Sequence, residues 1–234
     1  LANDIDLSEL KWTPIGQDED GKKFAGSFDG NGKTISGLKV DEETTDCIGL
    51  FGVIGENASV GNLTLSNASV SGDMYVGAVA GRIETASLEN IGLNNSSVKA
   101  AGNYIGGLAG WGEGSFSIED CRITGSAIEA ATSNYSGGIL GMAYGTGVIS
   151  SCAVSGSQVT CSSDAGGICG MMHGGSGSNT YEPEISRCSF TGGSVNTAGY
   201  YAGGIAGRCN SNKQNAVNQC YVNTDVTATS GCAG

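Results

Sequence analysis

Four tyrosines recur at one position of an internal repeat and form the most regular chemical feature of the sequence. They are Tyr75, Tyr104, Tyr135 and Tyr201, with Asp46 and Asp164 at the same position in the other complete copies. An exposed row of phenols would suit sugar binding, because the ring faces bury apolar surface while the hydroxyl groups form hydrogen bonds. The alternative is a ring stack that stabilises a corner of the fold. The sequence leaves both interpretations open.

A long connection carries two further candidates for ligand contact, His173 and Tyr181. Fifteen positions separate Gly170 from Ile185, whereas eight positions span the same connection in the preceding copy. Insertions in repeat proteins map to one face and often belong to the binding surface. We expect either a tolerated surface loop or a ligand contact, since no partner residues for a metal ion or a nucleophile accompany the histidine.

The carboxylates do not form a catalytic pattern. A glycosidase needs two of them flanking the scissile bond, but the acidic residues gather at 18–20 and 41–43, and no repeat position carries them in adjacent copies. Arg82 and Arg208 share a repeat position without the acidic neighbours that a polysaccharide lyase would require. We interpret segments 18–21 and 29–32 as turns, because neither has the distal bidentate Glu of a calcium loop. We therefore assign no catalytic residue, no metal and no cofactor.

The composition limits the class of partner. The 234-residue chain has a net charge of −12 and only 11 Lys and Arg residues, which excludes nucleic acid as a partner because its binders need a basic patch. No stretch approaches the ~18 consecutive apolar residues of a transmembrane helix, so we expect no membrane span. The 41 glycines, 2 prolines and 39% hydrophobic residues indicate a folded, glycine-rich protein.

A glycine-flanked core organises the whole chain into repeats. Seven copies end at glycines spaced 29, 29, 31, 29, 37 and 27 residues apart, with sequences such as Gly107-Leu108-Ala109-Gly110 and Gly138-Ile139-Leu140-Gly141. Each core is followed by an apolar-x-x-apolar-x-apolar stripe and then by a single apolar position five residues later. This spacing has a strand period and no sustained helical period.

Three short strands per copy cannot bury an apolar face alone, so we expect the copies to stack as coils. Equivalent strands would then pair in parallel about 4.8 Å apart, and identical positions would form interior columns. One predicted column is Leu63, Ile91, Cys121, Cys152, Cys188 and Cys220. Its four cysteines would be buried, reduced thiols. We predict an all-β, right-handed parallel β-helix (β-solenoid) of about 29-residue coils, since parallel crossovers are almost always right-handed.

The glycine core resembles the GLUG motif of bacterial surface proteins. Motif proteins of this kind include putative adhesins of gut Bacteroidetes and the non-catalytic parts of proteins similar to IgA proteases. The segments Trp12-Thr-Pro-Ile-Gly16 and Phe24-Ala-Gly-Ser-Phe-Asp-Gly-Asn-Gly-Lys-Thr-Ile-Ser-Gly-Leu38 are similar to the lead-ins that precede such repeats. Departures from the motif are Phe51, Leu140, Cys169 and Cys232. The resemblance implies a secreted or cell-surface location.

We predict a non-enzymatic adhesion module that binds a host or matrix glycan or protein. A structural stalk is the alternative, and a polysaccharide-active β-helix enzyme is the least favoured hypothesis. We expect one continuous solenoid domain, with residues 1–46 as the N-terminal cap and first coil and residues 47–234 as GLUG-type repeats. Position 1 carries no signal peptide and the last core stops at Gly234, so we expect the natural chain to extend beyond both ends or to be capped.

Overall fold

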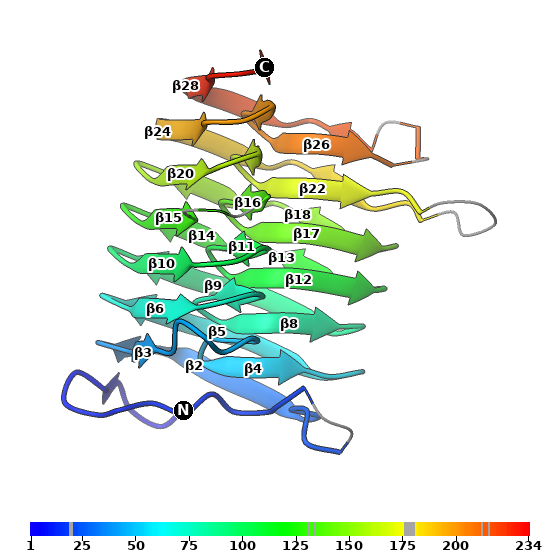
Figure 1. The fold of residues 1–234 in the computed structure, drawn as a ribbon. Helices are drawn as coiled ribbons and strands as arrows, with labels where there is room; N and C mark the ends of the chain where they lie inside the picture. The colour runs from blue at the N-terminus through cyan, green and yellow to red at the C-terminus, as the bar shows by residue number, and fades with distance from the viewer. Residues whose placement is uncertain (19–20, 131, 133, 176–180, 212, 215) are drawn as a thin grey trace.

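The computed structural model describes every residue except 19–20, 131, 133, 176–180, 212 and 215. The chain is a right-handed parallel β-solenoid of about 7 turns, as the sequence predicted. Figure 1 shows the coils stacked one on another from the N-terminus to the C-terminus.

Three parallel sheets run along the solenoid. The large sheet contains β1 (Ile5–Asp6), β2 (Ser27–Ser36), β3 (Lys39–Asp41), β5 (Ser59–Ser66), β6 (Ser69–Gly72), β9 (Ser87–Asn94), β10 (Ser97–Ala100), β13 (Ser117–Glu119), β14 (Arg122–Thr124), β15 (Ala127–Ala130), β18 (Val148–Ser150), β19 (Ala153–Ser155), β20 (Gln158–Cys161), β23 (Glu184–Ser186), β24 (Ser189–Thr197), β27 (Val217–Asn218) and β28 (Tyr221–Ala228). The corner sheet contains β7 (Val76–Gly77), β11 (Ile105–Gly106), β16 (Tyr135–Gly137), β21 (Asp164–Gly166), β25 (Tyr201–Gly203) and β29 (Cys232–Ala233). The flank sheet contains β4 (Phe51–Ile54), β8 (Ala80–Glu84), β12 (Ala109–Gly114), β17 (Leu140–Gly145), β22 (Cys169–His173) and β26 (Ala206–Asn210).

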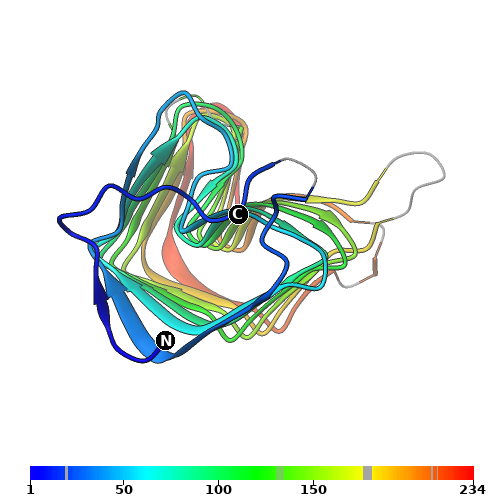
Figure 2. The same cartoon turned by 90° about the horizontal axis from the view of Figure 1, so that it is seen from below.

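The coil path is re-entrant. Seen along the axis in Figure 2, the chain leaves the large sheet, returns towards the middle of the cross-section and then runs outward again along the flank sheet. The corner sheet forms this inward bend. The glycines of the core permit it, because a Cβ on Gly107 would lie 2.2 Å from the carbonyl oxygen of Gly138, and one on Gly106 would lie 2.1 Å from that of Ala109.

The interior columns follow the predicted register. Val70, Val98, Ile128 and Val159 pair in successive coils and are buried. The same holds for the column that begins at Val60 and continues through Leu88, Ile118, Ile149 and Ile185. Equal apolar positions in each copy therefore build one continuous core, which is how stacked repeats bury faces that single repeats cannot.

A left-handed residue bends each coil inside the apolar-x-x-apolar stripe. Asn62 and Asn90 have φ values of 52° and 50°, and residues at the same position of later coils are also left-handed. Asparagine tolerates this conformation better than most residues. The Asn90 side-chain amide donates to the Asn62 side-chain oxygen at 2.9 Å, which links neighbouring corners. In β2 the same corner falls at Asn31, so segment 29–32 is a bend within a strand.

A column of buried serines completes the hydrogen bonding at the next bend. The backbone N–H groups of Ala68, Ser96 and Ser126 donate to the Oγ of Ser96, Ser126 and Ser157 at 3.0, 3.1 and 3.1 Å. Each of these hydroxyls also donates to a carbonyl two residues earlier. Serine side chains thus replace strand hydrogen bonds where the backbone turns, so no polar group of the column is left buried without a partner.

Candidate functional site

Three of the four predicted tyrosines form a continuous ring stack at the inward bend. Tyr75 and Tyr104 have ring centroids 5.1 Å apart with a 5° angle between planes, and Tyr104 and Tyr135 lie 5.3 Å apart at 15°. The coil spacing produces this geometry because successive tyrosines occupy one register position. We call Tyr75, Tyr104, Tyr135 and Tyr201, with the residues between them, the tyrosine column.

The stack covers the ring faces of the tyrosine column. All three stacked rings are half-buried, and burial raises the pKa of the Tyr75 and Tyr104 phenols, so both stay protonated near neutral pH. A sugar cannot lie flat on the faces between stacked rings. The column therefore stabilises the bend, and its ring edges and hydroxyls are the parts left for contact.

The register corrects one sequence assignment. Ile48 pairs with Val76, which places Cys47 beside Tyr75 and moves Asp46 one position outside the tyrosine column. The backbone confirms the equivalence, since Cys47 and Tyr75 are left-handed with φ values of 58° and 57°. Counting back from the core glycines gives the wrong residue here, because the pairing register changes between Ile48, which pairs with Val76, and Phe51, which pairs with Ala80.

An ion pair fills the gap that Asp164 leaves between Tyr135 and Tyr201. Asp164 pairs in register with both tyrosines, and its side chain is 1% exposed. Its carboxylate contacts Arg208 Nε at 2.8 Å, and Ser163 Oγ donates to it at 2.6 Å. The Arg208 guanidinium lies 6.0 Å from the Tyr135 ring centroid and 4.8 Å from that of Tyr201, within reach of cation–π attraction.

A second guanidinium lies over the other end of the stack. Arg82 Cζ is 5.5 Å from the Tyr75 ring centroid. Its guanidinium contacts the carboxylates of Asp18, Glu84 and Glu113 at 2.8, 2.9 and 3.2 Å. The acidic neighbours that sequence reasoning did not find for Arg82 and Arg208 therefore exist, but each forms an ion pair with its arginine. Paired carboxylates of this kind are poor candidates for a general acid and base.

A second group of rings lies on the outward side of the flank sheet. Trp111 stacks on Tyr144 with centroids 5.4 Å apart, and Tyr144 contacts His173 at 5.2 Å and Tyr181 at 4.8 Å. We call these four residues the aromatic face. All four are half-buried, and Trp111 meets Tyr104 edge-on at 88°, so the aromatic face adjoins the tyrosine column.

The structure thus brings His173 and Tyr181 together with two residues that sequence reasoning missed, Trp111 and Tyr144. Tyr181 hydrogen-bonds with Tyr144, which raises the pKa of the Tyr181 phenol. His173 Nδ1 accepts a hydrogen bond from the Gly175 backbone N–H at 2.9 Å. No shared residue type marks the two positions, because Met142 pairs with Trp111 and Glu113 pairs with Tyr144 in the neighbouring strands.

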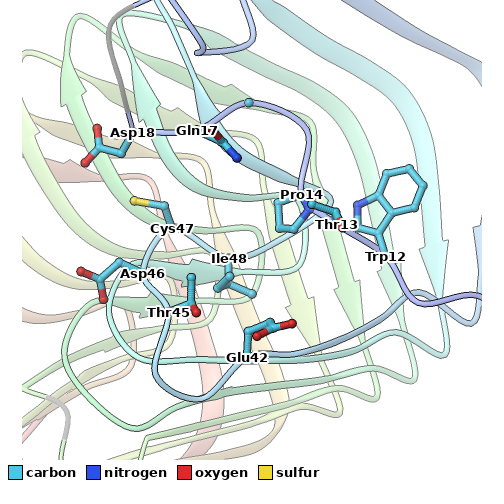
Figure 3. Close-up of a pocket in the computed structure, with 11 residues that line it drawn as sticks. Trp12, Thr13, Pro14, Gln17, Asp18, Glu42, Thr45, Asp46, Cys47 and Ile48 are labelled. Atoms are coloured by element: carbon cyan, nitrogen blue, oxygen red, sulfur yellow. The ribbon is translucent and has the colours of Figure 1, made fainter.

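A cavity of about 330 Å³ lies at the N-terminal end of the tyrosine column. Figure 3 shows Asp18, Asp46 and Cys47 on one side of it and Pro14 and Trp12 on the other. The segment before β2 and the segment between β3 and β4 form its walls. The sequence motifs did not indicate this cavity, because its lining residues come from two non-repeated stretches.

The nine cysteines are free thiols, and three of the four in the predicted column lie in the interior. Cys121, Cys152 and Cys188 are buried, whereas Cys220 in the last complete coil is partly exposed. Each thiol donates to the carbonyl two residues earlier, as Cys152 does to Ser150 at 3.2 Å. Hydrogen bonding to Cys121 raises the pKa of the Cys152 thiol, which lowers its reactivity.

Within the described part of the chain, His, Cys, Asp and Glu residues form no group of three or more that could hold a metal ion. Residues 19–20 of the acidic segment 18–21 lie outside that part. The described residues also include no helix of the length and apolar character needed to cross a membrane.

The repeat can now be compared with known proteins. Residues 101–129 match the family model of the GLUG motif. The chain contains a GLUG motif. The matched GLUG coil includes Tyr104 and the core from Gly107 to Gly110, and it carries Trp111 on its outward side. One GLUG repeat therefore contributes a ring to both the tyrosine column and the aromatic face.

Two curated proteins share sequence with parts of this GLUG chain. Halomucin of Haloquadratum walsbyi is 37% identical over 122 residues, which cover 47% of this chain and 1% of that protein. A protein of Evansella cellulosilytica named "Putative Gly-rich membrane protein" is 38% identical over 90 residues, which cover 35% of this chain and 10% of that protein. The chain therefore spans a small part of the curated relatives that it matches.

A solved structure shares the fold of the GLUG solenoid. It is named "putative immunoglobulin A1 protease" from Bacteroides ovatus, and it aligns with a TM-score of 0.63 at 19% identity. The alignment covers 97% of this chain and 69% of that one. At this identity the likeness concerns the backbone architecture alone.

Proposed function

We propose that this chain is a non-enzymatic binding module of a secreted or bacterial cell-surface protein, which recognises a host or matrix glycan or protein through the aromatic face. The observation that carries the proposal is the aromatic face itself. Four half-exposed rings from three successive coils contact one another outside the apolar core. Aromatic residues of this kind are enriched in binding surfaces, because they bury large apolar areas and retain polar atoms.

The location rests on the relatives. One carries "membrane protein" in its name, and another is Halomucin. The non-enzymatic assignment rests on the chemistry of the site. The aromatic face holds one histidine, whose Nδ1 already accepts a backbone hydrogen bond, and the neighbouring Glu84 and Glu113 share Arg82 as an ion-pair partner.

The proposal is tested with an array of glycans and a panel of extracellular matrix proteins. Trp111→Ala and Tyr144→Ala should each lower the affinity for the ligand at least tenfold, since central aromatic residues are typical hot spots. Tyr200→Ala is the matched control, because Tyr200 is an exposed tyrosine outside the aromatic face. A ligand that binds all three variants as it binds the parent protein would place recognition elsewhere.

The stalk is a second candidate, and one surface feature favours it. The outward positions of the large sheet carry a plain polar row in register, namely Ser36, Ser66, Asn94, Thr124, Ser155 and Thr191. Short polar side chains of this kind leave the outer face without an apolar patch for a partner, which suits a spacer. If the array and the panel give no ligand at all, the stalk function replaces the binding function.

A further inference from the structure

The tyrosine column lacks a ring at its N-terminal end. Cys47 lies beside Tyr75 in register, and its backbone has the same left-handed conformation as Tyr75 and Tyr104, with φ values of 58°, 57° and 65°. A thiol is much smaller than a phenol. The cavity of about 330 Å³ opens beside this position, with Cys47 among its lining residues.

The cavity combines apolar walls with acidic groups. Trp12, Pro14 and Ile48 supply apolar surface, and the Trp12 indole N–H donates to the Leu50 carbonyl at 3.0 Å, which fixes the ring. The acidic lining residues are Asp18, Glu42 and Asp46, and none of the described residues that line the cavity is Lys or Arg. Figure 3 shows Asp46 and Asp18 at one end and Glu42 at the lower edge.

The charge state of these carboxylates selects the kind of ligand. Asp18 pairs with Arg82 at 2.8 Å, and Glu42 pairs with Lys11 at 3.1 Å. Asp46 Oδ1 accepts a hydrogen bond from the Met74 backbone N–H at 3.0 Å. Ionised carboxylates only accept hydrogen bonds, so the ligand must bring donors. Because two of the three already have a cation, a neutral donor suits the cavity better than another positive charge.

We propose that this cavity binds one ring of a neutral sugar beside Cys47, next to the Arg82 guanidinium that lies over the Tyr75 ring. The flat face of the sugar would contact the apolar walls while its hydroxyls donate to Asp46 and Glu42. A pocket with apolar walls and a few convergent polar groups is the usual form of a small-ligand site. This inference rests on the proposed binding function and specifies its ligand as a neutral glycan, at a place separate from the aromatic face.

The test uses two variants of the full chain on an array of neutral oligosaccharides. Cys47→Tyr should fill the cavity, and its backbone already has the conformation that Tyr75 adopts, so the variant should fold. We expect it to reduce sugar binding at least tenfold. Asp46→Asn removes a charged acceptor without changing size and should weaken binding about tenfold, as the loss of one hydrogen bond to a charged group implies. Thr124→Tyr, on the outward side of β14, is the matched control and should bind as the parent does.

Circular dichroism and thermal unfolding establish that each variant is folded. Equal sugar affinity for the parent, Cys47→Tyr and Asp46→Asn overturns the inference. If Trp111→Ala alone abolishes sugar binding, the cavity is not the site and the proposed function stands. The parent protein could instead bind hexalysine and no sugar, and Asp46→Asn could abolish that binding. This outcome would show a cation site and refute the sugar assignment. An array without any bound neutral sugar also refutes it.

Discussion

Replacing Arg208 by methionine tests how the buried carboxylate in the tyrosine column is stabilised. The change keeps most of the side-chain stem but leaves the Asp164 carboxyl at 1% exposure without its cation, with Ser163 Oγ as its remaining side-chain donor at 2.6 Å. Breaking a buried ion pair by removing one partner costs about 3–5 kcal/mol. The lost cation–π contact with Tyr201, 4.8 Å from the guanidinium, adds about 0.5–1 kcal/mol. Because Arg208 itself is 37% exposed, we expect a total near the lower limit, about 3–4 kcal/mol.

Urea unfolding followed by tryptophan fluorescence measures this loss. Adding Asp164→Asn to Arg208→Met should recover part of it, because the amide removes the unpaired charge. Lys99→Met is the matched control, since the Lys99–Glu129 pair is 58% and 45% exposed and should contribute less than about 1 kcal/mol. A loss below about 1 kcal/mol for Arg208→Met, or a double variant no more stable than the single one, would refute the reasoning.

Three further changes test the packing. Phe51→Ala removes a ring at 0% exposure and should lower the free energy of unfolding by about 3–5 kcal/mol in a urea titration. Cys152→Ser should lower the free energy of unfolding by only about 1 kcal/mol, because the new hydroxyl can donate to the Ser150 carbonyl as the thiol does. Cys209→Ser, at an exposed position, is the control. A loss above about 3 kcal/mol for Cys152→Ser would contradict this hydrogen bond. Gly138→Ala would place a Cβ 2.0 Å from a backbone oxygen of the next coil, so thermal unfolding should show a loss of about 3 kcal/mol or more, and an unchanged midpoint would show that the bend can relax.

The repeats predicted the fold because every coil reuses the same inward positions. Val70, Val98 and Ile128 share one column in sequence and in the structure, since parallel stacking converts a period along the chain into a neighbour in space. The sequence did not show that each coil contains more than three strands, with four in one coil (β7 to β10) and five in the next (β11 to β15). The core from Gly107 to Gly110 divides between the corner sheet and the flank sheet, because its glycines let the backbone bend inward.

The candidate site was predictable only where it repeats. The tyrosine column was found because equal spacing marks it, but its first member was misplaced by one residue, at Asp46 instead of Cys47. Trp111 and Tyr144 were missed because their positions carry different residue types in other coils, such as Arg82. Outward positions need not satisfy a common core, so they carry no repeated signal for sequence reasoning to detect.

The bend at which Ser96, Ser126 and Ser157 form the column of buried serines lies in a span of nearly constant length, whereas a second span of the coil varies in length. Ten residues separate the apolar positions on either side of this bend in five coils, as from Val60 to Val70, and nine do so in the last coil, where Val217 is exposed. In the sequence, the extra residues of the longest copy fall between Gly170 and Ile185. An insertion in this connection leaves the serine hydroxyls within reach of their hydrogen-bond partners and keeps the core columns in register. Substitutions and insertions next to the aromatic face can therefore accumulate without shifting the strand register of the other coils.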